Sequence, residues 1–290
     1  MGSHLGRLGS RRLTCLASLL LAGCLRAASA NPPHARITLV SEQTSIQPGS
    51  KFWVGLHFEL EKHWHIYWVN PGDSGEPPRV VWDLPQGFRA GPINWPAPRR
   101  LENPPLVDYG YEDEVLLLVP LYPPSRVPAG RSAELRATVK WLVCSSICVP
   151  EQQHVALKLP FKDDPPKYDP RRRGLFNRTR EQLPRPMPSG WSATVLSEAN
   201  QFILSVKTGT RESTATFFPL EPLEIKDAAP QQVALGNGAI HLALQKSDQL
   251  LKPVAFLSGV LMIGDGKAIA INAPVISGSG RSLRERRYRK

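Results

Sequence analysis

Residues 51–61 read KFWVGLHFELE, a stretch that alternates in the manner of a β-strand. One face of such a strand would carry five apolar side chains, Phe52, Val54, Leu56, Phe58 and Leu60. The segment RITLVSEQ at 36–43 has the same character, and the turn sequence QPGS at 47–50 lies between the two. This region therefore predicts two strands joined by a turn, with one apolar face directed toward a core.

Short strand patterns of this kind, separated by turn signals, continue to about residue 275. The chain has 29 prolines and 22 glycines, a composition that favours turns over long helices. No helical repeat lies between the strand patterns, so a parallel α/β architecture is not expected. We predict an all-β protein built from β-sandwiches.

Residues 162–190 differ from the segments on both sides. They contain many charges, six prolines and little apolar periodicity, which predicts a linker with one helical turn near Phe176. The linker would separate a first domain at 31–161 from a second β-sandwich at 191–276. Residues 277–290 are expected to form a disordered basic tail.

The N-terminus has the features of a targeting segment. Three arginines precede an apolar run, and Ala28-Ser29-Ala30 offers a cleavage site, so we predict a signal peptide at 1–30 and a periplasmic protein. Leu21-Ala22-Gly23-Cys24 also resembles a bacterial lipobox, and the alternative is a lipoprotein anchored at Cys24. No later stretch has the apolar length of a membrane span, so contact with a membrane is expected only through that anchor.

The net charge of +11 is concentrated at the two ends of the chain. The first 30 residues contribute +4 and the last ten contribute +5, which leaves +2 for residues 31–280. A nearly neutral folded part without a basic stripe is a poor nucleic-acid binder. We therefore expect no nucleic-acid partner.

Two cysteines, Cys144 and Cys148, remain after export, because Cys15 lies in the targeting segment and Cys24 is removed or lipidated. In an extended strand their Cα atoms would be about 13 Å apart, whereas a disulfide needs roughly 4.4 to 6.8 Å. A bridge therefore requires either a helical turn or a tight reversal at Ser145-Ser146. The closed loop is so small that the bridge would stabilise the fold little, which favours a redox role over a structural one.

Two other interpretations of this region remain open. A plain structural disulfide is common in exported proteins. The two cysteines together with His63, His65 or His154 could also form a soft copper or zinc site, since His63 and His65 would share a face of a strand. No ligand spacing here is diagnostic, so no metal and no other cofactor is expected.

Five motifs in a fixed order carry a family resemblance. They are W-H-I-Y-W-x-N-P-G-D-S-G from Trp64, W-x-L-P-x-G from Trp82, W-P-A-P from Trp95, Y-G-Y-E from Tyr109 and W-L-V-C-x-x-x-C-x-P-E from Trp141. Across residues 36–160 the chain is similar to the periplasmic N-terminal domain family of the thiol:disulfide interchange protein DsbD, in its variant related to ScsB. FFP at 217–219 extends the similarity weakly into the second half.

This resemblance implies immunoglobulin-like sandwiches and a catalytic dithiol of Cys144 and Cys148. It also implies a membrane thiol reductase as electron donor and oxidised periplasmic proteins as acceptors. The membrane segment that usually follows in this family is not found in the sequence, so a separate polypeptide is expected as donor. Four residues are candidates for shielding or supporting the pair: Asn70, Asp73, Tyr109 and Tyr111. Which cysteine attacks first stays open.

Overall fold

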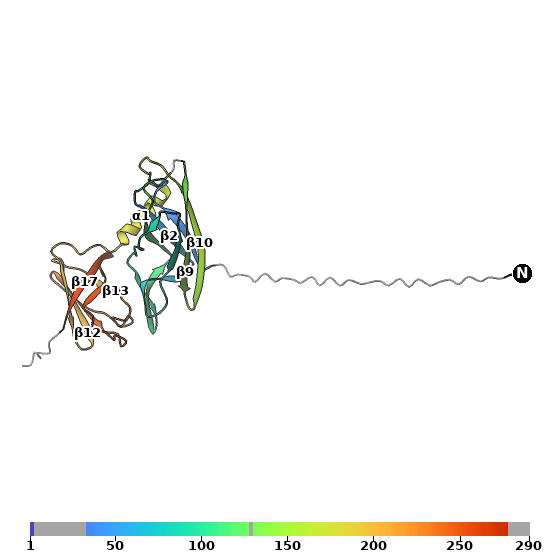
Figure 1. Cartoon of the computed structure of the whole chain (residues 1–290). Helices are drawn as coiled ribbons and strands as arrows, with labels where there is room; N and C mark the ends of the chain where they lie inside the picture. Colours follow the sequence, from blue (N-terminus) through green and yellow to red (C-terminus); the bar gives the residue numbers. More distant parts are fainter. Residues whose placement is uncertain (3–32, 128–129, 278–290) are drawn as a thin grey trace, which may run out of the picture. The chain divides into compact units, whose positions relative to one another are not determined.

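The computed structural model describes residues 1–2, 33–127 and 130–277 (Figure 1). The expected signal peptide, with Cys15 and Cys24, lies outside the described residues apart from its first two positions. The expected basic tail lies outside them from residue 278 onward. Within the described ranges, no helix is both long and apolar enough to cross a membrane.

The first part of the chain forms two antiparallel sheets. One has the strand order β1-β2-β8-β5, and the other has the order β10-β9-β3-β7-β6, with β4 also paired to β9. The strands are β1 (Ala35–Ser41), β2 (Phe52–Leu60), β3 (His65–Gly72), β4 (Arg79–Asp83), β5 (Arg89–Ala90), β6 (Arg99–Asn103), β7 (Leu106–Glu112), β8 (Glu114–Tyr122), β9 (Ser132–Cys144) and β10 (Cys148–Pro160).

One apolar core joins the inner faces of these two sheets. The alternating apolar residues of β2 lie in this core as expected, and Phe52, Val54, Leu56 and Phe58 are at most 1% exposed. In β9 the odd-numbered residues from Ala133 to Val143 are likewise buried in the core. Alternation thus leaves the even-numbered residues of β9 on the opposite, outer face of the sheet.

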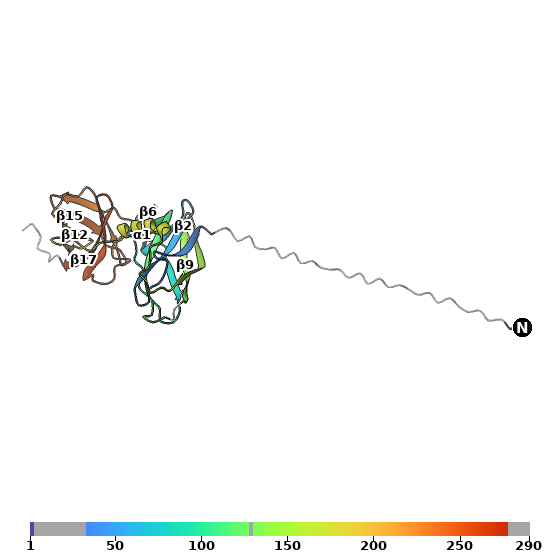
Figure 2. The same cartoon turned by 90° about the horizontal axis from the view of Figure 1, so that it is seen from above.

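The second part of the chain contains seven further strands around a second core. Their hydrogen-bonded order is β13-β16-β17-β11-β12-β15-β14, in which only β11 and β17 run parallel. β13 at one end of this order and β15 beside the other end both contribute to the core, as expected for a sandwich, whereas every residue of β14 is exposed. The all-β prediction is confirmed, and β12, β15 and β17 of this part are labelled in Figure 2. The strands are β11 (Ser192–Ser197), β12 (Gln201–Lys207), β13 (Ala215–Pro219), β14 (Gln232–Gly236), β15 (Ala239–Gln245), β16 (Phe256–Ile263) and β17 (Lys267–Ser277).

The helical turn expected near Phe176 is a full helix, α1 (Pro170–Gln182). Its first turn is capped by the Asp169 side chain, which accepts from the Arg171 backbone N–H, and Pro170 fits the first helical position. Phe176 is fully buried against the outer face of β1 and β8, beside Val40 and Leu116. Sequence periodicity missed the helix because its remaining faces are rich in arginine, so few apolar residues mark it.

Contacts between side chains of the first part and the polypeptide of the second part surround Asp227. The Tyr109 hydroxyl donates to Asp227 Oδ1 at 2.9 Å, and Arg100 donates to the Asp227 carbonyl at 2.5 Å. Phe218 packs edge-on against both Trp68 and Tyr109. The predicted division of the chain at 162–190 stays a prediction.

Burial raises the pKa of the Asp227 carboxyl to about 6; the Tyr109 hydrogen bond opposes this shift and the nearby Asp73 adds to it. The folded protein therefore holds a proton on Asp227 at pH values where the unfolded chain has already released it. The resulting stabilisation is fully present below about pH 4 and is lost as the pH rises through about 6.

We therefore expect Asp227→Asn to remove part of the pH dependence of folding. The amide keeps an acceptor for Tyr109, so the free energy of unfolding of the wild type should fall relative to the variant between about pH 4 and 6. Urea unfolding at a series of pH values measures this difference. Asp265→Asn, in an exposed turn, is the matched control. A difference that is flat with pH contradicts the assignment.

Candidate redox site

Cys144 and Cys148 form a disulfide at the end of the hairpin made by β9 and β10. The two residues face each other in the register of the hairpin, with their Cα atoms 4.2 Å apart. Ser145, Ser146 and Ile147 make the connection, and the Ser145 N–H donates to the Ile147 carbonyl at 3.0 Å. Of the two conformations that sequence allowed, the structure has the tight reversal.

The disulfide lies on the outer face of the sheet, away from the apolar core. Val143 belongs to the core, so its neighbour Cys144 is directed to the other side. On the adjacent strand β3, His65 is the register partner of Cys144, and Tyr67 follows two residues later on the same face. Alternation along two neighbouring strands therefore brings an imidazole and a phenol beside the sulfur atoms.

The two cysteines differ in exposure. Cys144 is only 1% exposed, whereas Cys148 is exposed to solvent. Ile147, directly before Cys148, is 63% exposed and is one of the large apolar side chains on the surface. Cys148 is therefore the cysteine of the pair that a reacting molecule can approach from solvent.

Tyr67 covers the buried sulfur. Its hydroxyl donates to Cys144 Sγ at 2.9 Å and lies 3.4 Å from Cys148 Sγ. The loop after β3 closes over the phenol ring: a Cβ at Gly75 would collide with that ring, and Gly75 has a φ of +79°, which favours glycine. Burial raises the pKa of the Tyr67 hydroxyl, so the group is a proton donor at neutral pH.

A buried histidine and aspartate lie on the same face. His65 Nε2 is 3.8 Å from Asp108 Oδ2 and has no hydrogen-bond partner among the described residues. The other oxygen of Asp108 accepts from the backbone N–H and the hydroxyl of Ser74. Burial lowers the pKa of His65 against the opposing effect of Asp108, and burial raises the pKa of Asp108. The environment of the disulfide thus disfavours charge on all its neighbours.

The four residues predicted to shield the pair make their hydrogen bonds elsewhere. Tyr109 and Tyr111 are on the core face of β7, where the Tyr111 hydroxyl donates to the Pro96 carbonyl. The Asn70 side chain donates to the Pro219 carbonyl, and Asp73 accepts from the Val107 backbone N–H. Asn70 and Asp73 thus anchor the loop that carries Gly75.

The three histidines considered as possible ligands of a metal site do not lie together. His63 precedes β3 in an exposed turn with a φ of 71°, so the expectation that it shares a strand face with His65 is wrong. Strand alternation begins only at His65, after the turn closed by the Trp64 N–H and the Glu61 carbonyl. His154 bonds Thr138 farther along the hairpin. The described residues contain no group of three His, Cys, Asp or Glu side chains that could hold a metal ion.

Tyr67, Asp108 and Ser74 were not among the predicted site residues. Tyr67 and Ser74 are part of the first motif, and counting every second residue from His65 indicates that Tyr67 shares its face. The signal that could not be obtained from sequence is the pairing of β3 with the end of β9, which brings this face to Cys144.

Comparisons with known proteins agree with this geometry. Residues 36–160 match the family described as thiol:disulfide interchange protein DsbD, N-terminal. The N-terminal periplasmic domain of ScsB from Proteus mirabilis superposes with a TM-score of 0.59 at 18% identity, over 84% of this chain and 92% of that one. At this identity the structure shows a shared fold.

Other solved structures match less well. The major pilin subunit BcpA of Bacillus cereus has a TM-score of 0.28 at 9% identity, over 84% of this chain and 68% of that chain. The YadV chaperone has a TM-score of 0.23 at 13% identity, over 83% of this chain and all of that chain. No curated protein sequence matches.

The expected resemblance and the immunoglobulin-like sandwich fold are therefore confirmed, and the matched segment includes both cysteines together with β3 and β7. Over residues 36–160 this chain is therefore similar to the DsbD N-terminal family of thiol:disulfide interchange proteins.

Proposed function

We propose that this protein is an exported dithiol carrier that takes electrons from a membrane thiol reductase and passes them to oxidised periplasmic proteins. The observation that carries the proposal is the asymmetry of the pair: Cys148 is exposed beside an exposed Ile147, while Cys144 is buried under the Tyr67 hydroxyl. Thiol:disulfide exchange needs one sulfur that a partner can reach and a second that resolves the mixed disulfide.

In the donating direction, the thiolate of Cys148 attacks a sulfur of the partner disulfide. A mixed disulfide forms and the first partner thiolate leaves, taking up a proton. The thiolate of Cys144 then attacks Cys148 Sγ, the second partner thiolate leaves, and the intramolecular disulfide forms. Two electrons pass from the dithiol to the partner. The reductase restores the dithiol by the reverse sequence, in which Cys144 is the leaving group.

Tyr67 acts on the buried sulfur in both directions. Its hydroxyl donates to Cys144 Sγ, so a thiolate at this position gains a charge-assisted hydrogen bond inside a site that otherwise disfavours charge. The bond therefore stabilises the thiolate of Cys144 when this sulfur is the leaving group. This role resembles that of an oxyanion-hole donor in acyl transfer.

A purely structural role for the disulfide has less support. β9 and β10 are each 13 residues long and pair along their full length, so the hairpin is well defined without a bridge at its end. The covalent loop closed by the bridge spans a sequence separation of only 4, near the bottom of the range in which cross-links stabilise a fold. The periplasmic location is proposed from the predicted signal peptide, or from a lipid anchor at Cys24.

Single cysteine variants test the assignment of roles. Cys144→Ser leaves the exposed Cys148 without its resolving partner, so mixed disulfides with exported proteins should accumulate. Cys148→Ser leaves only the buried Cys144, and trapping should be at least about tenfold weaker because partners cannot reach that sulfur. Non-reducing electrophoresis of each protein, purified from the periplasm, measures the adducts. Equal trapping by both variants would contradict the assignment.

Tyr67→Phe removes the hydroxyl and leaves the ring in place. Because hydrogen bonds to charged groups contribute about 1.5–3 kcal/mol, we expect the pKa of Cys144 in the reduced protein to rise. The resolving step should slow by about four- to fifteenfold, because the greater nucleophilicity of a more basic thiolate offsets part of the lost thiolate fraction. Stopped-flow measurement of partner release across pH values follows both quantities. Tyr111→Phe, which also loses a buried hydroxyl but on the core face, is the matched control and should leave this rate unchanged.

A further inference from the structure

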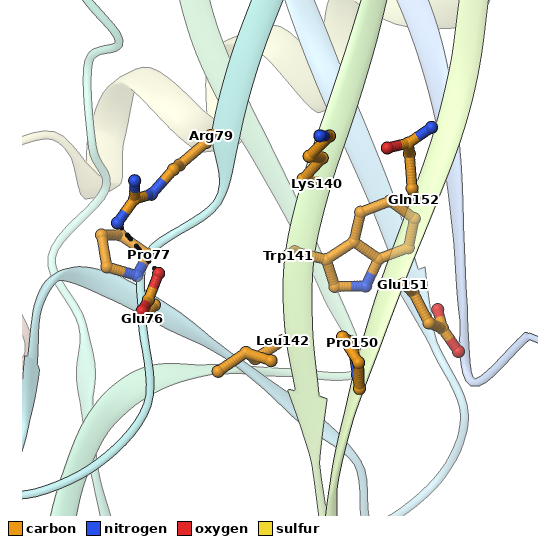
Figure 3. Close-up of a pocket in the computed structure, with 9 residues that line it drawn as sticks. All are labelled: Glu76, Pro77, Arg79, Lys140, Trp141, Leu142, Pro150, Glu151 and Gln152. Atoms are coloured by element: carbon orange, nitrogen blue, oxygen red, sulfur yellow. Dashed lines mark hydrogen bonds and ion pairs between the residues drawn. The ribbon is translucent and has the colours of Figure 1, made fainter.

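A groove runs along the outer face of the sheet, over β9, β10 and the start of β4 (Figure 3). Its volume is about 420 Å³. Figure 3 shows Lys140 and Leu142 on β9 and Pro150 and Gln152 on β10. Across from them lie Glu76 and Pro77, on the segment before β4, and Arg79, the first residue of β4.

The register of the hairpin makes this groove a continuation of the redox site. Leu142 pairs with Pro150, which is the next pair on the same face after Cys144 and Cys148. Lys140 pairs with Gln152, one step farther along. At about 3.3 Å per residue, the first pair lies about 7 Å from the disulfide along the strands and the second about 13 Å.

The chemistry of the groove changes along this direction. Next to the disulfide, the floor is formed by Leu142 and Pro150, which are apolar. Beyond it lies the ammonium group of Lys140, for which no ion pair is found in the part of the chain that the structure describes. The other cation of the groove, Arg79, is paired with Glu76 at 2.9 Å. Glu151 also lines the groove, but it is the register partner of the core residue Trp141 and its carboxylate accepts from the His34 backbone N–H. On the outer face, among the described residues, the charge of the groove left without an ion pair is therefore that of Lys140.

We infer that this groove seats the polypeptide that flanks the reactive cysteine of an acceptor protein. The inference rests on the proposed function, because the flanking segment can enter only when the cysteine itself reaches Cys148. The occupant is an extended segment whose side chains repeat every two residues, so that an apolar side chain two positions from the cysteine meets Leu142 and Pro150. An acidic side chain four positions away meets Lys140.

The exposed Ile147 supports docking at this end of the molecule. It lies in the turn between the two cysteines and is 63% exposed, although it is a large apolar side chain. An acceptor that covers Cys148 would bury Ile147 at one end of the interface and the Leu142–Pro150 floor at the other.

The inference can be tested with the reduced full chain and two symmetric peptides. Each has a central cysteine in a mixed disulfide with 2-mercaptoethanol, a leucine two positions away on both sides, and either glutamate or lysine four positions away. The symmetry removes any dependence on strand direction. We expect the glutamate peptide to be reduced about threefold faster at low salt, the size of effect of one exposed ion pair.

Lys140→Glu should abolish or reverse this preference, while Lys252→Glu, which makes the same charge change on an exposed loop, should keep it. Leu142→Asp should slow the reduction of both peptides by about fivefold, the loss expected for a partly buried leucine. The rate of each variant with the small neutral 2-hydroxyethyl disulfide is the reference for its peptide rates, so that any change in the redox site itself cancels.

Equal rates for the two peptides with the wild type, or a preference that survives Lys140→Glu, would overturn the docking inference alone. If the reduced wild type left both peptides and the small disulfide unreduced, the proposed function would fall together with the inference. The two failures are therefore distinguishable.

Discussion

The strict alternation of β9 is the constraint on which the rest of the site depends. Its odd-numbered residues, from Ala133 to Val143, fill the core of the first sandwich, and this fixes Cys144 on the outer face. Pairing with β10 then places Cys148 opposite Cys144, and pairing with β3 places His65 and Tyr67 beside it. A one-residue slip of β9 would direct both cysteines into the core and expose the apolar residues. Core packing and redox geometry are thus specified by the same register.

A redox pair on an outer sheet face needs a cover of its own, because the core cannot shield it. The loop after β3 supplies that cover through Gly75, which packs on the ring of Tyr67, and through Ser74, which bonds Asp108. The loop is held in turn by Asn70, whose side chain reaches the Pro219 carbonyl in the second part of the chain. The second sandwich therefore contributes to the site by holding the loop that encloses the buried sulfur.

Sequence patterns predicted most of the strands, though not β6 and β7, together with the two sandwiches and the importance of Cys144 and Cys148. These follow from local alternation and from the cysteines that remain after export. The same patterns did not predict that Tyr67 lies at the site, because Tyr67 is 77 positions from Cys144 in sequence and the two meet through strand pairing. Tyr109 and Tyr111 were predicted at the site, yet they are on the core face of β7, since the intervening Gly110 is the residue paired with Tyr67. The sequence predicted only one helical turn where α1 has 13 residues, because the exposed faces of the helix are rich in arginine and few apolar residues mark it.

The redox potential of the Cys144–Cys148 pair tests the central claim most directly. The purified protein would be equilibrated in dithiol and glutathione buffers of graded potential, and the reduced fraction would be measured by thiol alkylation. A carrier that both accepts and donates electrons should have a potential between about −270 and −120 mV, the range of known exchange catalysts. A potential below about −300 mV is typical of structural disulfides and would contradict the account.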